Sequence, residues 1–434
     1  MDEASYRNHC AILEEELVCA LGCTEPIAVA YAAALARAAL GAEPESITSA
    51  CSGNIIKNVK SVTVPNSGGL RGIEAAATLG TIGGDATRAL EVLEAVSPAD
   101  IERTKELLAD GYCDVTLVED VPNLYVRATA AAAGHTAVAC IEERHTNVTE
   151  LSRDGVTVSV AGVTATGPGT HVETSRADRT KLTLESIWEF AHVVDVADVE
   201  PTVGRQIDLN KRIADEGIRG DWGANIGSTL LSSRPHDVVA KAKAMAAAGS
   251  DARMSGCPLP VVIICGRGNQ GITASMPVLE YAHELWSSRE ALVRAVVLSD
   301  LTAVHVKHFV GELSAFCGAV TAGAGAGAGI CYLRGGSFAQ YEATIVNTIA
   351  NVGGIVCDGA KPSCAAKISA AVDAAILGCD MALSDGSFHA GDGLVGADAE
   401  ETIRSMGYVG RVGMHPTDVE ILNIMIGKTD VSGE

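Results

Sequence analysis

The amino-acid sequence predicts an α+β fold, in which a mainly helical domain is formed by the N- and C-terminal segments and an α/β domain is inserted between them. Three observations predict it. Residues 3–40 have helical spacing, strand-like runs lie between residues 113 and 165, and the chain from about residue 180 onward is again predominantly helical. The expected division is residues 1–44 and 178–434 for the helical domain and residues 45–177 for the inserted α+β domain.

The elements can be followed in order along the chain. "EPES" at 43–46 ends the first helical stretch, and "ITSACSGNIIKNVKSVTVP" at 47–65 alternates as a strand does. Helical segments are expected around 71–80, 84–96 and 98–110. Strands are expected in "CDVTLVED" (113–120), "NLYVRATAAA" (123–132), "HTAVACIEE" (135–143) and "GVTVSVAGVTA" (155–165). Residues 167–180 have the glycine and polar content of a linker.

Composition and charge narrow the class of protein. With 434 residues, of which 47% are hydrophobic, the chain can bury large cores and is expected to form two or three domains. A formal net charge of −22 opposes binding to phosphate backbones and anionic membranes, so neither nucleic acid nor a membrane is an expected partner. The N-terminal residues lack the features of a signal peptide, which predicts a cytoplasmic protein, and a homodimer is the default expectation.

Two glycine-rich segments need an interpretation. "GAVTAGAGAGAGICYLRGG" at 318–336 is either a helix packed closely against its neighbours or a connecting loop. The G-x-G-x-x-G pattern at 266–271 follows an apolar run, as a dinucleotide-binding turn would. However, Pro277 is expected to interrupt the helix that such a turn requires, and the next segment reads as helix rather than as a βαβ unit. We therefore expect no NAD and interpret the loop as a binding site for a small carboxylate or ammonium, with a plain turn as the alternative.

The cysteines are the second source of candidate chemistry. Thirteen cysteines in a reducing compartment are expected to be thiols, most of them in the core. Four stand out by context: Cys23, Cys317, Cys357 and Cys364. The spacing of the last two differs from zinc ribbons and ferredoxins, so buried core thiols remain the alternative to a metal site. Three thiolates on a cubane cluster would leave one iron open, which suits elimination of water or sulfide from an amino acid.

Six segments, spread in order over nearly the whole chain, carry a family resemblance: "GCTEP" (22–26), "CSGNIIKNVKSVTVPNSGG" (51–69), "GSDARMSGCPLP" (249–260), "GRGNQGITASMPV" (266–278), "LSAFCGAV" (313–320) and "CDGAKPSCAAK" (357–367). They resemble the L-cysteine desulfidase family, which is similar to the alpha-chain region of iron–sulfur L-serine dehydratases. The resemblance implies a lyase with an oxygen-sensitive [4Fe-4S] cluster and no pyridoxal phosphate, which converts L-cysteine and water to pyruvate, ammonia and sulfide.

The resemblance also implies the residues of the site. It implies three cluster ligands, with the fourth iron open to the amino-acid substrate: Cys317, Cys357 and Cys364. It implies substrate-binding residues from the two domains: Asn269, Gln270 and Gly271 for the carboxylate, with Asn54, Lys57 and Asn58 completing the pocket. Cys23 and Lys57 are the expected catalytic residues, Lys57 as a candidate base for the α-proton and Cys23 as an acid/base or a transient ligand.

The chain departs from the family pattern in two places. Residues 263–267, "IICGR", replace a loop rich in serine and asparagine, which puts the substrate in question more than the reaction class, and the chain ends in "DVSGE" rather than in a cysteine-bearing tail. The same machinery acting on L-serine is therefore an alternative. Pyridoxal phosphate on Lys57 or Lys361 would lack a phosphate cradle. A non-catalytic protein that senses a metal or an amino acid is the alternative from another class.

Several other residues have expected supporting places. His305 and His308 are expected on a solvated helix edge. Asp251 and Arg253 are expected either to pair with each other and position the following loop or to cap a helix. Asp358, between the two proposed ligands at 357 and 364, is expected to adjust the cluster through hydrogen bonds, together with Lys361.

Overall fold

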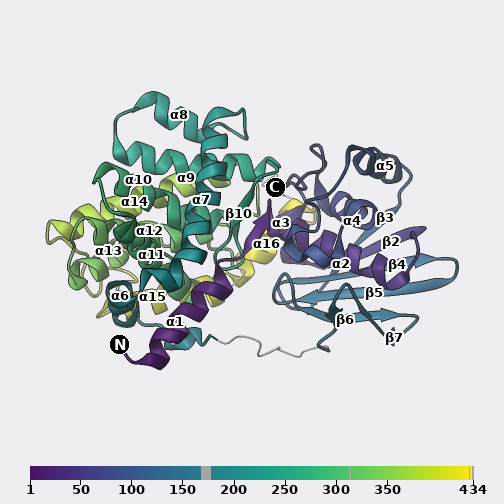
Figure 1. Cartoon of the computed structure of the whole chain (residues 1–434), viewed down its shortest axis with the longest axis horizontal. Coiled ribbons are helices and arrows are strands. Elements are labelled where there is room, and N and C mark those ends of the chain that lie inside the picture. The colour runs from purple at the N-terminus through teal and green to yellow at the C-terminus, as the bar shows by residue number, and fades with distance from the viewer. Residues whose placement is uncertain (168–176, 312–313, 430, 433–434) are drawn as a thin grey trace.

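A computed structural model describes residues 1–167, 177–311, 314–429 and 431–432. Helices gather in one part of the molecule and a twisted sheet with its own helices forms the other (Figure 1). This arrangement confirms the predicted α+β class with a mainly helical body. Residues 168–176 of the expected linker lie outside the described residues.

The main sheet has six strands in the order β3-β2-β4-β5-β6-β7. Its strands are β2 (Ser46–Ser52), β3 (Cys113–Val118), β4 (Tyr125–Ala132), β5 (His135–Glu142), β6 (Val148–Arg153) and β7 (Val156–Thr157). β2 and β3 are parallel, and the other pairs are antiparallel. Buried and partly buried residues alternate along β4, as expected for a sheet that packs on one face.

Helix α2 (Thr24–Leu40) covers the sheet. It packs on β4, β5 and β6 and against α4 (Gly72–Gly83), and almost all of its side chains are buried. The small side chains of α2 and α4 let the two helix backbones approach closely. At the closest point, a Cβ on Gly80 of α4 would lie 2.3 Å from the carbonyl oxygen of Ala30 in α2. The helix at 24–40 therefore lies with the sheet, while α1 (Glu3–Glu16) packs on helices of the other part. The division at residues 44 and 178 stays a prediction.

The helical body contains most of the remaining elements. Its helices are α1, α6 (Leu184–Val193), α7 (Val196–Arg219), α8 (Ile226–Ser233), α9 (Val238–Met254), α10 (Gly268–Glu284), α11 (Arg289–Val310), α12 (Gly318–Leu333), α13 (Phe338–Val352), α14 (Cys364–Leu383) and α15 (Ala399–Tyr408). The other elements are the short 3₁₀ turn η2 (Arg179–Lys181), the π-helical turn η3 (Val409–Gly413) and the final helix α16 (His415–Met425). None of the helices within the described residues has the length and apolar character that crossing a bilayer requires.

The glycine-alanine segment forms the central helix, α12, packed by α10, α11, α13 and α14. Its alternate glycines serve two faces because residues four apart share a face. A Cβ on Gly325 would lie 2.3 Å from the carbonyl oxygen of Ser299 in α11, and one on Gly323 would lie 3.0 Å from that of Ala371 in α14. The sequence alone left two alternatives for this segment, a helix and a connecting loop. The segment forms a helix because it packs closely against these neighbours.

Several local predictions were wrong. The helical stretch at 3–40 is interrupted by β1 (Cys19–Leu21), which pairs with β10 (Pro260–Val262), a distant partner that local spacing cannot reveal. The segment at 47–65 leaves the sheet at α3 (Gly53–Val59), because Ser52 caps a helix there. Pro277 lies inside α10, where packing against α9 and α12 outweighs one lost hydrogen bond.

The remaining differences lie in the sheet region. Residues 84–96 form only a short 3₁₀ turn, η1 (Ala86–Glu91), followed by turns, whereas α5 (Pro98–Ala109) and α4 match their expected segments. Strand β6 was not predicted, since its residues carry no regular apolar alternation. The expected strand at 155–165 is divided into β7, β8 (Ser159–Val160) and β9 (Val163–Thr164), the last two forming a small separate hairpin.

Candidate functional site

Four cysteines from three separate segments of the sequence line one cavity of about 80 Å³. They are Cys23, Cys317, Cys357 and Cys364, and we call the cavity the thiol pocket. It lies where α3 meets the N-terminal ends of α2, α10, α12 and α14. The predicted catalytic and ligand residues, named from segments spread over the whole chain, are thus brought together in one place.

The predicted substrate-binding residues line the same pocket, with one exception. Those present are Asn54, Lys57, Asn58, Asn269 and Gln270. Gly271 does not line the pocket, and its role is to let two backbones meet, since a Cβ there would lie 2.1 Å from the carbonyl oxygen of Val262. The glycine loop therefore contributes side chains at two positions and close packing at the third.

Cys317 and Cys357 are held opposite each other by backbone hydrogen bonds. The Cys317 amide donates to the carbonyl oxygen of Ile355 (2.8 Å), and the Cys357 amide donates to that of Ala315 (2.6 Å). These bonds make a short antiparallel bridge between the two loops. Cys317 caps α12 and Cys364 is the first residue of α14, so both sulfur atoms lie at helix N-termini, where negative charge is stabilised.

The thiols of Cys317 and Cys357 share a hydrogen bond. Because Cys317 donates and Cys357 accepts, the bond raises the pKa of Cys317 and lowers the pKa of Cys357, and the nearby Lys57 and Arg267 lower the latter further. Burial raises the pKa of Cys364, whose sulfur lies 3.7 Å from the carbonyl oxygen of Gly359. The pair therefore favours one thiolate, at Cys357, among neutral thiols.

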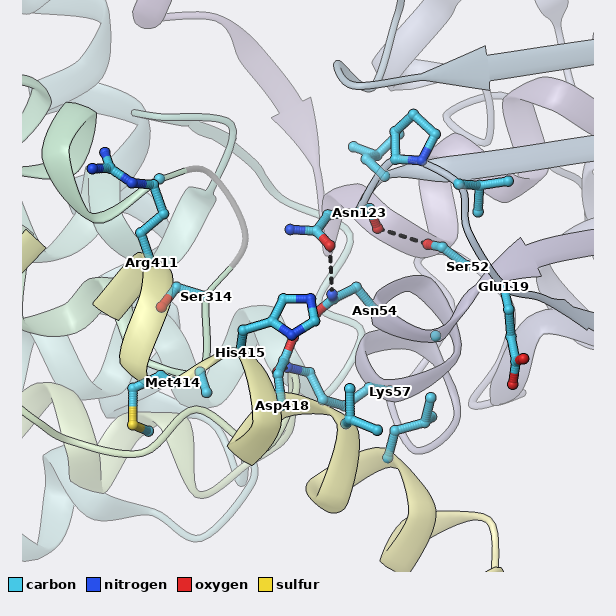
Figure 2. A pocket seen from close by; sticks show the side chains of 18 of the residues that line it. Ser52, Asn54, Lys57, Glu119, Asn123, Ser314, Arg411, Met414, His415 and Asp418 are labelled. Atoms are coloured by element: carbon cyan, nitrogen blue, oxygen red, sulfur yellow. Dashed lines mark hydrogen bonds and ion pairs between the residues drawn. The ribbon is translucent and has the colours of Figure 1, made fainter. Parts of the chain in front are cut away.

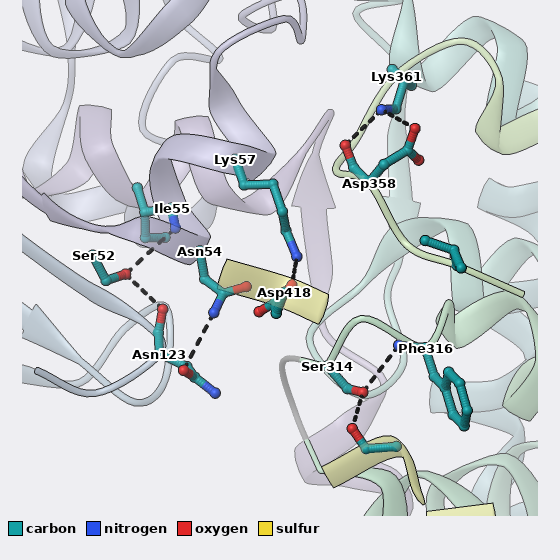
Figure 3. A network of polar contacts seen from close by, with 12 residues as sticks. Ser52, Asn54, Ile55, Lys57, Asn123, Ser314, Phe316, Asp358, Lys361 and Asp418 are labelled. Atoms are coloured by element: carbon teal, nitrogen blue, oxygen red, sulfur yellow. Dashed lines mark hydrogen bonds and ion pairs between the residues drawn. The ribbon is translucent and has the colours of Figure 1, made fainter. Parts of the chain in front are cut away.

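Lys57 is ion-paired with Asp418 of the final helix, and Figure 3 shows its side chain reaching across from α3 to α16. The Lys57 side chain is 2% exposed and that of Asp418 is 13% exposed. At the N-terminal end of α3, Asn54 donates to the Oδ1 of Asn123 (3.3 Å), and Ser52 donates to the backbone carbonyl of the same residue (2.6 Å). The loop after β3 and the C-terminal helix thus both hold α3 in place.

A second, larger cavity lies beside the thiol pocket. This junction cavity has a volume of about 1020 Å³ and is lined by α3, the loop at 119–124, η3 and α16. It shares Asn54, Lys57 and Ser314 with the thiol pocket. Figure 2 shows Asn54, Lys57 and Asp418 close together, with Ser314 and Arg411 across the cavity. The two cavities are therefore adjacent along α3.

Cys23 and Glu25 form the opposite wall of the thiol pocket. Glu25 is fully buried, its Oε1 pairs with Arg267, and its Oε2 accepts from the Cys23 thiol (3.2 Å) and from the Thr24 hydroxyl (3.2 Å). Burial raises the pKa of Cys23, whereas the positive charges of Arg253 and Arg267 act in the opposite direction. At neutral pH Cys23 is therefore a thiol with a carboxylate acceptor beside it.

The thiol pocket is cationic although the chain as a whole is acidic. Four basic side chains line it, against the single carboxylate of Glu25: Lys57, Arg253, Arg267 and Lys307. Lys307 is 6% exposed, and burial lowers its pKa, with Arg267 adding to the effect. A surplus of positive charge in a buried pocket favours thiolates and anionic ligands.

The first turn of α10 presents Asn269 and Gln270 to the pocket. The Oδ1 of Asn269 accepts from Nη1 of Arg253 (3.1 Å), and the Oε1 of Gln270 accepts from the Thr321 hydroxyl (3.1 Å). A Cβ on Gly318 would lie 2.5 Å from the Gln270 side chain. Both amide oxygens are thus already used, which leaves the two amide NH₂ groups to face a ligand as donors.

The structure decides several expectations about single residues. Asp251 accepts from the amides of Ile226 (2.7 Å) and Ala224 (3.3 Å) and so caps the start of α8, the second of its two expected roles, and no ion pair among the described residues joins it to Arg253. His305 is 2% exposed and contacts Glu400 through Nε2 (2.8 Å), whereas only His308 lies on an exposed edge. Packing of α15 against α11 buries the first histidine, which helical spacing alone did not reveal.

Asp358 lies between two ligand candidates and is held by lysines. The Nζ of Lys361 is 2.6 Å from its Oδ2, and Lys367 pairs with its Oδ1. Gly359 follows with a φ of +98°, and a Cβ there would lie 2.4 Å from the carbonyl oxygen of Lys57. The loop from Cys357 to Cys364 is therefore pressed directly onto α3.

Sequence reasoning missed four residues around the site. They are Glu25, Arg267, Lys307 and Asp418. Glu25 stood inside the "GCTEP" motif, and its position after Cys23 at a helix start was an available signal. No local sequence signal pointed to Asp418, because it pairs with Lys57, which lies 361 residues earlier in the chain.

The glycine pattern at 266–271 does open a helix after a strand, but the topology differs from a dinucleotide-binding unit. Among the described strands, β10 pairs with β1 in an antiparallel ribbon, and α10 is followed by α11. A βαβ unit requires a second, parallel strand at that point. The structure thus supports the interpretation of this loop as part of the thiol pocket.

A family model described as the serine dehydratase alpha chain matches residues 87–423. The chain belongs to this family. The match includes the three candidate ligands, Cys317, Cys357 and Cys364, together with Asn269 and Gln270. The α2 and α3 residues of the site lie before it.

Relatives that extend over nearly the whole chain carry the name UPF0597 protein. One from Desulfitobacterium hafniense is 48% identical over 98% of this chain and 97% of its own length. Another, from Lachnoclostridium phytofermentans, is 47% identical over 97% of this chain and all of its own length, and one from Treponema denticola is 42% identical over 98% and 99%. The chain therefore has full-length counterparts of the same size.

Proposed function

We propose that this protein is an iron–sulfur-dependent lyase that eliminates the β-substituent of a small L-amino acid, with L-cysteine as the substrate and pyruvate, ammonia and hydrogen sulfide as products. The observation that carries the proposal is the convergence of three cysteines with cationic and amide side chains on the thiol pocket. Membership of the serine dehydratase alpha-chain family supports the reaction class. A cytoplasmic location and a homodimer belong to the same proposal.

Three cysteines in one pocket are a donor set that suits an iron–sulfur cluster, because thiolates are the usual ligands of such clusters and each binds a different iron. Cys317, Cys357 and Cys364 would hold a [4Fe-4S] cluster, and its one iron without a protein ligand would supply a Lewis acid for the leaving group.

The residues of the chain would bind and orient the substrate. The NH₂ groups of Asn269 and Gln270 face the pocket as donors, and the surrounding cations favour the carboxylate end of an amino acid. Elimination removes the α-proton and breaks the bond from Cβ to sulfur, and water then converts the resulting enamine to pyruvate and ammonium. No described step needs an added oxidant or reductant.

Two lysines are candidates for the base that accepts the α-proton. Lys57 lines the pocket and is ion-paired with Asp418. Burial lowers the pKa of Lys307, which favours the neutral amine that a base requires. Cys23, held as a thiol beside Glu25, can return a proton to the departing sulfide or to the product. We keep Lys57 and Cys23 as the proposed catalytic residues and add Lys307.

L-Serine is the second candidate substrate, because the matching family model is described as a serine dehydratase chain. The two substrates differ only in the atom on Cβ, and a soft sulfur ligand binds iron more favourably than a hydroxyl does. Arg267, from the loop that departs from the family pattern, brings a cation to the pocket wall where that pattern has serine and asparagine. This part of the wall is expected to set the preference.

The test is anaerobic reconstitution with iron and sulfide, followed by visible spectroscopy and by assays of pyruvate and sulfide from L-cysteine and L-serine. Serine variants of Cys317, Cys357 or Cys364 are each expected to lose the cluster absorption and the activity. Cys379→Ser is the matched control, because Cys379 shares a hydrogen bond with Cys331 in the helical body away from the thiol pocket. Stable zinc binding without turnover of either amino acid would refute the proposal and support a sensing protein.

A further inference from the structure

Arg253 is a buried cation whose hydrogen-bonding capacity is mostly unused. It lies in the last turn of α9, is 3% exposed and lines the thiol pocket. Its Nη1 donates to the Oδ1 of Asn269 (3.1 Å), but its Nε and Nη2 have no partner among the described residues. Burying a guanidinium with unpartnered N–H groups is costly, so these two groups indicate a missing acceptor.

The position of the guanidinium is fixed on both sides. Gly268 packs against it so closely that a Cβ there would lie 2.3 Å from Nε and 2.6 Å from Cζ. On the other side, Asn269 holds Nη1. The nearest acidic candidate in sequence, Asp251, is instead bonded to the start of α8. The side chain is therefore held in place without a carboxylate partner among the described residues.

The two unpartnered nitrogens belong to the same edge of the guanidinium. Nε and Nη2 point their N–H groups in parallel, which is the geometry that matches both oxygens of one carboxylate. A thiolate or a single carbonyl oxygen would use only one of them. The pattern of used and unused donors thus favours a planar anion with two oxygens.

We propose that Arg253 binds the α-carboxylate of the substrate through Nε and Nη2, with Asn269 positioning the guanidinium and Gln270 adding a further donor. This inference rests on the proposed function and deepens it, since it assigns the carboxylate contact mainly to α9 rather than to the glycine loop. The carboxylate then sits in the pocket that Arg253 lines together with Cys23 and Cys364. A substrate anchored there places its α- and β-carbons within the thiol pocket.

L-Alanine and L-alaninamide are suitable probes, because neither has a β-leaving group and they differ only at the carboxyl group. Their dissociation constants are measured by calorimetry on the reconstituted protein. Wild-type protein is expected to bind L-alanine about 10- to 100-fold more tightly than the amide, the range that charge-assisted hydrogen bonds provide. Arg253→Gln is expected to reduce this ratio to below about 3-fold while leaving the amide's binding unchanged.

Arg253→Lys keeps the charge but not the paired donors, so we expect a ratio of the two dissociation constants between those of the wild type and Arg253→Gln. This variant also tests the inference if Arg253→Gln does not fold. Arg334→Gln is the matched control, since Arg334 is a partly buried arginine paired with Asp380 outside the thiol pocket. It is expected to keep the wild-type ratio and the wild-type cluster absorption.

Three results would overturn the inference: an unchanged ratio in Arg253→Gln, no binding of L-alanine by the wild-type protein, or loss of cluster absorption in both Arg253 variants, which would assign the guanidinium to the thiolates. The proposed function would be refuted by a different result. A protein that binds L-alanine through Arg253 but converts neither L-cysteine nor L-serine would keep the carboxylate site and lose the lyase activity.

Discussion

Asp300 is a fully buried carboxyl group beneath the glycine loop of the thiol pocket. Its Oδ1 accepts from Nε2 of Gln206 (2.9 Å), and its Oδ2 has no partner in the part of the chain that the structure describes. The same Nε2 lies 3.5 Å from the carbonyl oxygen of Gly271, which links Asp300 to the first turn of α10. Burial raises the pKa of Asp300 to about 8, so the folded protein keeps this proton near neutral pH.

The raised pKa makes folding stability depend on pH with a definite sign. In the unfolded chain the group ionises near pH 4, so between about pH 4 and pH 8 the folded state binds one proton more than the unfolded state, and the free energy of unfolding falls as pH rises. The slope is about 1.4 kcal/mol per pH unit until the folded-state pKa is approached. From pH 6 to pH 8 the wild-type protein is expected to lose about 2 kcal/mol through this group.

Asp300→Asn removes the titration and keeps the shape. Urea unfolding of both proteins at pH 6, 7, 8 and 9 gives the difference between their free energies of unfolding, in which all other titrating groups cancel. This difference is expected to shift by about 2 kcal/mol in favour of the variant between pH 6 and pH 8 and to level off above pH 9. Asp373→Asn, at an exposed position paired with Lys243, is the control and should show no such shift. Parallel pH profiles for wild type and Asp300→Asn would refute the reasoning.

Three further predictions concern packing around α12 and the site. Gly325→Ala places a methyl group 2.3 Å from the carbonyl oxygen of Ser299 and is expected to lower the free energy of unfolding by about 2 kcal/mol in urea titrations; an unchanged midpoint would contradict the close packing. Asp418→Asn leaves the buried ammonium of Lys57 unpaired and is expected to cost about 3 kcal/mol, most of which Lys57→Met should restore in the double variant. Gly359→Ala is expected to displace the ligand loop and reduce cluster absorption at an unchanged circular dichroism spectrum, and full absorption would argue against contact with α3.

The sequence predicted the fold class better than it predicted local structure. Cys317 and Asn269, expected at one site because their segments resemble a known family, line one pocket. The helix at Gly53–Val59 and the ribbon of β1 with β10 were missed. Both depend on capping or pairing that apolar periodicity does not encode.

By itself the sequence determined that the chain is acidic and rich in alanine and glycine, that helices alternate with a sheet region, and which cysteines and glycine loop are the candidates for the chemistry. These properties follow from residue type, local spacing and motif. Only the tertiary structure decided that Lys57 meets Asp418, that Glu25 meets Arg267, and that Arg253 stands buried with two donors unpartnered among the described residues. Such pairings join residues far apart in the chain, and burial, which sets their energy, exists only after the helices have packed.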